Sequence, residues 1–193
     1  MSTYNVSLRE AVIPRSSALT KSLLVLVGAL FLAALAQISI PVPGSPVPVT
    51  GQTLGVLLLA TAYGANMGFA TFALYLVMGI AGAPVYAGQS HGFEKISGAT
   101  GGYLVGMLLA SWVLGALAGR KWDQRIFSGI TTMLIGNVII FTFGLIWLHH
   151  VVGKSWSWTF SAGLTPFIFG EAIKIAIAGT SLPAVWKLVA RTR

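Results

Sequence analysis

Residues 21–40 read KSLLVLVGALFLAALAQISI, a run in which no charged residue follows Lys21. A helix of about 20 apolar residues is long enough to cross the hydrocarbon core of a lipid bilayer. The run is too long for a signal peptide and has no small-residue cleavage site at its end. Five more apolar runs follow, at residues 49–64, 67–84, 99–119, 126–148 and 164–190. The sequence therefore predicts an all-α integral membrane protein, with a domain of six transmembrane helices over residues 21–190.

The composition of the whole chain agrees with this class. Of 193 residues, 55% are hydrophobic and 8% are charged, whereas a soluble domain has about 25% charged residues. Disorder requires low hydrophobicity and high charge, so it is excluded as well. Six spans use about 120 residues, which leaves no room for a separate soluble catalytic domain. The chain has no Cys, which excludes disulfides, thiolate zinc sites and Cys nucleophiles.

The positions of the basic residues predict the orientation of the helices. Nine of the 12 Lys and Arg residues fall into three groups that six spans bring to one side of the membrane: Arg9, Arg15 and Lys21; Arg120, Lys121 and Arg125; Lys187, Arg191 and Arg193. Cytoplasmic loops of membrane proteins carry an excess of Lys and Arg over the loops on the other side. We therefore expect both termini in the cytoplasm, with residues 1–20 as an N-terminal segment and residues 191–193 as a tail. The net charge of +8 is then a topology signal, and no nucleic-acid partner is expected.

Two charged residues, Glu171 and Lys174, stand inside the sixth apolar run. A charge at the bilayer centre costs about 2.5–3.5 kcal/mol on insertion scales, so each needs a partner or a function. Their spacing of three residues puts them on one face of a helix. They form either a structural ion pair or, as we favour, a ligand site. In that site the acid would accept and the ammonium donate hydrogen bonds, which matches a urea-like group.

Two further polar side chains are candidates for the same site. Gln52 follows a segment at residues 40–50 that contains four Pro residues. Such a segment forbids helix and favours extended backbone, either as a stiff turn or as a wall of an outward-facing pocket. Gln52 is expected near the outer mouth of that pocket. Asn137, in the fifth run, is explained equally well by an interhelical hydrogen bond and by a ligand contact.

The loop at residues 82–103 is rich in Gly and is expected on the outer side. Tyr86 and Tyr103 offer rings that stack on a flat ligand, and Gly88 offers a backbone N–H group. The loop is either a lid over the pocket or an ordinary surface loop.

A second class of function, an intramembrane enzyme, finds little support. Gly153-Lys154-Ser155 matches the end of a P-loop, but that motif needs Gly where Leu148 stands. His149 and His150 are adjacent and share no helix face, and all three histidines are expected in outer loops. We therefore predict no catalytic residue, no metal site and no cofactor.

A series of motifs runs in order along the membrane domain. They are Gln37-Ile-Ser-Ile-Pro41, Pro48-Val-Thr-Gly-Gln-Thr53, Tyr75-Leu-Val-Met-Gly-Ile-Ala-Gly-Ala-Pro-Val-Tyr-Ala-Gly88, Thr100-Gly-Gly-Tyr-Leu-Val-Gly106, Gly136-Asn137, Gly144-Leu-Ile-Trp-Leu148 and Pro166-Phe-x-x-Gly-Glu171-x-x-Lys174. Taken in this order, they resemble the BioY family, the biotin-binding S components of energy-coupling-factor (ECF) vitamin transporters. The resemblance implies a six-helix membrane fold with an outward-facing biotin pocket. It also implies high-affinity biotin binding and uptake across the bacterial cytoplasmic membrane.

The resemblance also implies roles for particular residues. Glu171 and Lys174 would contact the ureido ring of biotin, with Glu171 at a position where the family usually has Asp. Ala99 stands where the family usually has Pro. Ala29 and Ala33 match a small-residue motif that docks on the ECF transmembrane coupling protein, although such spacing also serves packing inside a chain. ABC-type ATPase subunits would supply ATP hydrolysis. The alternative is a stand-alone transporter of biotin or of another vitamin.

Overall fold

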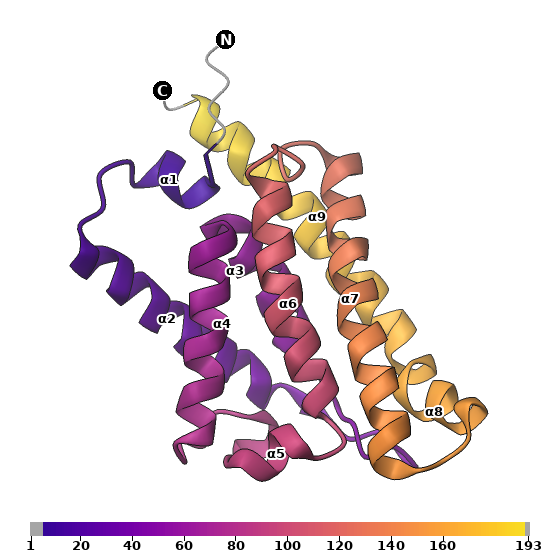
Figure 1. Cartoon of the computed structure of the whole chain (residues 1–193). Helices are drawn as coiled ribbons and strands as arrows, with labels where there is room; N and C mark the ends of the chain where they lie inside the picture. The colour runs from indigo at the N-terminus through magenta and orange to yellow at the C-terminus, as the bar shows by residue number, and fades with distance from the viewer. Residues whose placement is uncertain (1–5, 192–193) are drawn as a thin grey trace.

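The computed structural model describes residues 6–191, and long helices dominate it (Figure 1). These helices are α2 (Ala18–Gln37), α3 (Gln52–Tyr63), α4 (Ala65–Ile80), α6 (Gly101–Ala118), α7 (Ile126–Val152) and α9 (Ile168–Arg191). The short elements are α1 (Leu8–Val12), an antiparallel pair of β1 (Ser39–Ile40) and β2 (Val49–Thr50), η1 (Ala87–Gln89), α5 (Phe93–Ser97), α8 (Trp156–Gly163) and η2 (Thr165–Phe167). Each of the six apolar runs thus overlaps one of the six helices named first.

The lengths of the helices bear on how many of them cross the membrane. Within residues 6–191, four segments are long and apolar enough to do so: α2, α6, α7 and Trp156–Arg191, which joins α8 to α9. The helices α3 and α4 are apolar but shorter, and the 12 residues of α3 cover only about 18 Å. The all-helical membrane class is confirmed, and the count of six crossings stays a prediction.

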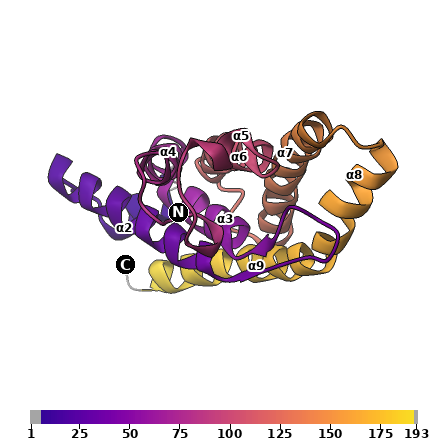
Figure 2. The same ribbon diagram turned by 90° about the horizontal axis from the view of Figure 1, so that it is seen from below.

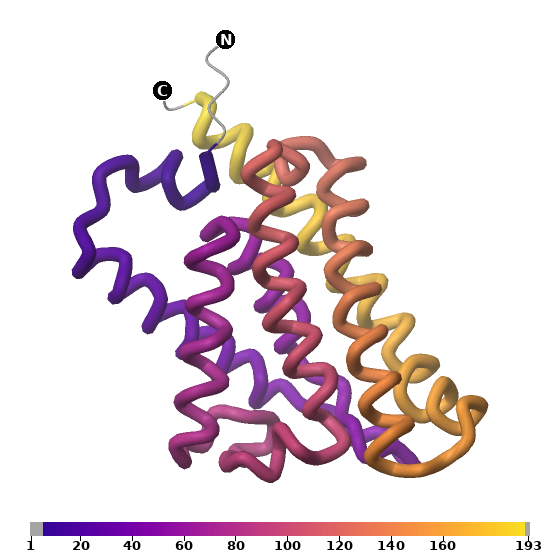
Figure 3. The backbone as a smooth tube through the Cα atoms, in the orientation of Figure 1, coloured from indigo at the N-terminus to yellow at the C-terminus, as the bar shows by residue number. Residues whose placement is uncertain are grey.

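Helix α6 lies at the centre, with α4 and α7 beside it and α3 packed against it (Figures 1 and 3). Glycines allow this close approach. A Cβ atom at Gly106 would lie 2.9 Å from the Cα of Ile140 in α7, and one at Gly115 would overlap the backbone N of Ala65. Since backbone atoms cannot move aside as a flexible side chain can, these two positions of α6 require Gly.

We expect Gly115→Ala to lower the free energy of unfolding by about 1–3 kcal/mol, because the added methyl overpacks the contact with the α3–α4 turn. Gly119→Ala is the matched control, since a Cβ there would lie 3.4 Å from its nearest neighbour, an ordinary contact. Thermal unfolding of the purified variants in detergent measures both effects. Equal midpoints for the two variants would contradict this account of the packing.

The predicted basic groups meet at one end of the fold. In Figure 1 the helix α1, the α6–α7 connection and the C-terminal part of α9 lie toward the same end, which we call the basic end. Arg9, Arg120 and Lys187 lie on these three elements. Residues 1–5 and Arg193 are outside the described residues. The arrangement agrees with a shared cytoplasmic side, and the orientation in the membrane stays a prediction.

A buried carboxyl group fastens the α6–α7 connection to α9 at the basic end. Asp123 is fully buried, and its Oδ2 accepts a hydrogen bond of 2.6 Å from Nε1 of Trp186. Its Oδ1 has no partner among the described residues. Burial raises the pKa of Asp123 to about 6, because removal from water disfavours the charged form.

This raised pKa predicts a pH-dependent stability. Between pH 4 and pH 6, roughly, the folded chain keeps a proton that the unfolded chain releases, so the free energy of unfolding falls as pH rises through this range and then levels off. The loss attributable to Asp123 is about 3 kcal/mol. Asp123→Asn should therefore unfold at a higher temperature than the parent at pH 7.5, with a smaller difference at pH 5. A difference that does not change with pH would count against the buried, titrating carboxyl.

One prediction about the end of α7 is wrong. His149 and His150 were expected in an outer loop, but both belong to α7, which continues to Val152. Val151 and Val152 extend the apolar run, and the helix ends only at Gly153, whose φ of 65° is the left-handed conformation that closes many helices. His149 stacks on Trp156 at the start of α8, with ring centroids 4.0 Å apart.

The small residues of α2 face the interior of the chain. Ala29 is fully buried and Ala33 is half-buried against the core. Close approach is needed here, because a Cβ at Gly28 would come within 2.7 Å of Thr71 in α4. The spacing thus serves packing within the chain, and a role of Ala29 and Ala33 in docking stays a prediction.

Candidate ligand-binding site

A cavity opens at the end of the helices opposite the basic end. Its empty volume is about 700 Å³, a figure that includes space open to the outside. The residues that line it are Pro46, Val47, Pro48, Thr50, Gln52, Thr53, Tyr86, Ala87, Ser90, Lys95, Thr100, Tyr103, Leu104, Met107, Phe141, Phe167 and Glu171. They come from the β1–β2 hairpin, the segment between α4 and α6, the helices α3, α6, α7 and α9, and η2.

The Pro-rich segment forms one wall of this cavity. The strands β1 and β2 pair, and the N–H of Gly51 donates to the carbonyl of Ile38 over 2.9 Å. The Pro residues, which have no N–H for a sheet ladder, stand in the loop between the strands, where Pro46 and Pro48 line the cavity. Viewed from below, the hairpin reaches from α2 across toward α8 and α9 (Figure 2). The geometry thus favours the pocket-wall interpretation of this segment.

Three aromatic rings form another wall. Tyr103 of α6 packs against Phe141 of α7 at 5.7 Å and nearly parallel to Phe167 at 6.3 Å, measured between ring centroids. The hydroxyl of Tyr103 donates to the carbonyl of Gly163 over 2.8 Å, and that of Tyr86 donates to the carbonyl of Leu76 over 2.7 Å. Because both hydroxyls are bonded inside the protein, these tyrosines offer mainly their rings to a ligand.

The two intramembrane charges form a tight, buried pair. Lys174 Nζ lies 2.6 Å from Glu171 Oε1, and it also donates to the carbonyl of Thr50 over 2.6 Å and to Oγ1 of Thr53 over 2.9 Å. These three bonds use all three hydrogens of the ammonium. The hydroxyl of Thr53 donates in turn to Glu171 Oε1 over 2.8 Å. Lys174 thus ties α9 to the junction of β2 and α3, and it is not among the residues that line the cavity.

The second carboxylate oxygen of Glu171 differs from the first in its hydrogen bonding. Oε2 is buried and has no hydrogen-bond partner among the described residues. A buried acceptor without a partner costs about 1–3 kcal/mol, and more when it is charged. Glu171 thus lines the cavity with Oε1 held by Thr53 and Lys174, and Oε2 is left as an acceptor without a partner among the described residues.

Gln52 also lies in the cavity wall, at the first turn of α3. Its Nε2 donates to the hydroxyl of Tyr75 over 2.7 Å, and its Oε1 accepts from Oγ1 of Thr50 over 3.0 Å. These bonds hold the amide in a fixed orientation at the edge of the site.

The remaining predicted site residues lie elsewhere. Gly88 follows the cavity-lining Ala87 but does not line the cavity itself; its φ is 67°. Asn137 lines a neighbouring groove between α7 and α9, which shares Phe141 and Glu171 with the cavity. Its Nδ2 donates to the carbonyl of Met133 over 3.3 Å, and its Oδ1 has no partner among the described residues. The proposed ligand contacts of Gly88 and Asn137 stay predictions.

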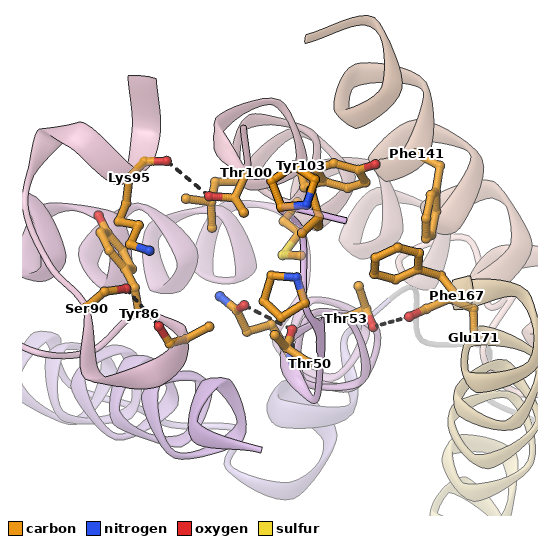
Figure 4. A pocket seen from close by; sticks show the side chains of 17 residues that line it. Thr50, Thr53, Tyr86, Ser90, Lys95, Thr100, Tyr103, Phe141, Phe167 and Glu171 are labelled. Atoms are coloured by element: carbon orange, nitrogen blue, oxygen red, sulfur yellow. Dashed lines mark hydrogen bonds between the residues drawn. The ribbon is translucent and has the colours of Figure 1, made fainter. Parts of the chain in front are cut away.

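Several residues of the site were not predicted. Thr53 stands in the motif that ends the Pro-rich segment, yet nothing in the sequence tells that its hydroxyl bonds Glu171. Lys95, Ser90 and Thr100 add polar groups, and Figure 4 shows Ser90 and Lys95 across the cavity from Phe141 and Phe167. Lys95 falls within the predicted loop at residues 82–103. Its place in the short helix α5, which has no apolar period, could not be predicted.

The fold and this cavity together define a class: a helical membrane protein that binds a small molecule with apolar and polar parts. The BioY family model matches residues 8–191, and the chain belongs to the BioY family. The predicted membership is thus confirmed.

The relatives and a solved structure agree with this family. The chain is 35% identical to biotin transporter BioY2 of Lactococcus lactis over 165 residues, covering 82% of this chain and 87% of that one. It is 34% identical to a probable biotin transporter BioY of Pyrococcus horikoshii over 143 residues, covering 74% and 82%. The crystal structure of an S-component for biotin from an ECF-type ABC transporter matches 90% of this chain and 95% of that one, with a TM-score of 0.79 at 23% identity. That likeness establishes a shared fold.

Proposed function

We propose that the chain binds biotin with high affinity and serves its uptake across the membrane as the substrate-specific component of an ECF transporter. The names of its relatives support biotin as the substrate. The observation that carries the proposal is the unpartnered Oε2 of Glu171 in the wall of the cavity. A site built to bond a polar group discriminates strongly against molecules that lack it.

The parts of biotin have counterparts around the cavity. An N–H of its ureido ring would donate to Glu171 Oε2. The ureido oxygen would accept from Lys174 if the ammonium exchanged one of its three present bonds for it. The apolar ring and chain would lie against Tyr103, Phe141 and Phe167. Lys95, across the cavity from Phe167 (Figure 4), complements the terminal carboxylate.

The partners and the location are part of the same proposal. The chain has no P-loop motif, so ATP hydrolysis would belong to ABC-type ATPase subunits. These would be joined through the ECF transmembrane coupling protein in the cytoplasmic membrane of a bacterium. Uptake of labelled biotin by cells that produce the chain is then expected to rise when these subunits are produced with it.

Isothermal titration of the detergent-purified chain tests the choice of substrate. We expect heat of binding with biotin, and none with riboflavin or thiamine at the same concentrations. Binding of riboflavin or thiamine as tight as that of biotin would contradict the proposed specificity. No heat of binding with any of the three compounds would contradict a vitamin-binding role.

A further inference from the structure

A polar depression far from the ligand cavity lies between α1 and the first turn of α2. Figure 1 shows α1 at the basic end. Three basic side chains line it, Arg9, Arg15 and Lys21, together with Glu10 and Ser16. The cations outnumber the single carboxylate by two charges. Such a surface attracts an anion.

Arg9 distinguishes this depression from an ordinary solvated surface. Its side chain is only 9% exposed, its Nη1 donates to Oγ of Ser16 over 3.1 Å, and its Nη2 donates to Glu10 Oε1 over 3.0 Å. Glu10 is itself fixed, because its Oε2 accepts from the N–H of Ser7 in the capping box of α1. The Nε of Arg9 is buried and lacks a partner among residues 6–191. The guanidinium is thus oriented by two of its five N–H donors, and its Nε has no partner.

The position of the depression along α2 indicates which anion it meets. Lys21 is the last charged residue of α2, and after Ser22 the exposed side chains as far as Ala34 are apolar: Leu23 is 52% exposed and Val27 is 57% exposed. The change from basic to apolar surface places the depression at the depth of lipid headgroups. Phosphate is the anion of that layer, and Arg recognises it through charge-assisted hydrogen bonds.

We infer that Arg9, Arg15 and Lys21 form a binding site for the phosphate group of an anionic phospholipid on the cytoplasmic leaflet. Arg9 Nε and the two exposed cations would hold the phosphate oxygens, while Glu10 and Ser16 keep the guanidinium in place. The inference is independent of the ligand in the cavity, since the two sites lie at opposite ends of the helices.

Native mass spectrometry of the chain with phosphatidylglycerol tests the inference. Arg9→Gln should weaken phosphatidylglycerol binding about fivefold or more. Arg125→Gln is the matched control: it removes an exposed charge at the same end but outside the depression, and it should leave that binding unchanged. Equal binding by Arg9→Gln and the parent, or equal loss in both variants, would overturn the site.

Two further arms complete the test. Arg15→Gln and Lys21→Gln alter exposed side chains, so they keep the test decisive if Arg9→Gln does not fold, and each should weaken phosphatidylglycerol binding. Unchanged binding in both would contradict the site. Inorganic phosphate at the same concentration should not displace the lipid; full displacement would assign the site to a soluble phosphate instead. Biotin affinity, measured in parallel, is expected to stay the same in all these variants.

Discussion

Glu171→Gln is expected to weaken biotin binding by about 100-fold or more while the protein still reaches the membrane. The exchange keeps the size of the side chain but removes the charge that strengthens its hydrogen bonds. It also gives the amide a donor that competes with the N–H of the ligand. Equilibrium binding of biotin to the purified variant measures the effect.

Two variants control this prediction. Glu171→Asp keeps the charge and shortens the side chain by one methylene, so binding should stay within about tenfold of the parent, below the loss for a missing charged hydrogen bond. Glu94→Gln removes a charge from α5 at a position that does not line the cavity, and it should have no effect. An unchanged affinity in Glu171→Gln would remove Glu171 from the site.

Lys174→Met is expected to abolish tight biotin binding and also to lower the free energy of unfolding by about 3–5 kcal/mol. It leaves the carboxylate of Glu171 buried without its cation, and it removes the bonds to Thr50 and Thr53 that join α9 to β2 and α3. Thermal unfolding in detergent and biotin titration measure the two losses separately.

The double variant Glu171→Gln/Lys174→Met separates pairing from binding. Removing the carboxylate as well relieves the uncompensated buried charge, so the double variant should be more stable than Lys174→Met alone. Its biotin binding should remain lost, because both polar contacts are gone. If the double variant lost as much stability as the two single variants lose together, the two residues of the pair would not be coupled.

The sequence predicted the helices well, because a membrane span depends on length and hydropathy alone. The spacing of Glu171 and Lys174 also sufficed to place the pair on one face of α9. Gln52 was predicted at the site from its place after the Pro-rich segment, and Tyr86 and Tyr103 from their place in the Gly-rich loop; all three line one cavity. These features depend on local sequence patterns or on resemblance to a family, and both can be recognised in a single sequence.

Contacts between distant segments could not be predicted in the same way. The ammonium of Lys174 donates hydrogen bonds to Thr50 and Thr53, which stand more than 120 residues earlier in the chain. No pattern in the sequence links these residues. The spacing of Ala29 and Ala33 does not show whether this face of α2 packs within the chain or faces a partner protein. Small residues permit both kinds of contact, and the packing of α2 on α4 can be seen only in the structure.

The central claim is that the free oxygen of Glu171 receives the ureido group, and a crystal structure of the complex with biotin tests it most directly. We expect a ureido nitrogen within about 2.7–3.2 Å of Glu171 Oε2, with the biotin ring against Tyr103 and Phe167. Biotin bound away from this cavity, or bound in it with Oε2 still unpartnered, would contradict the claim.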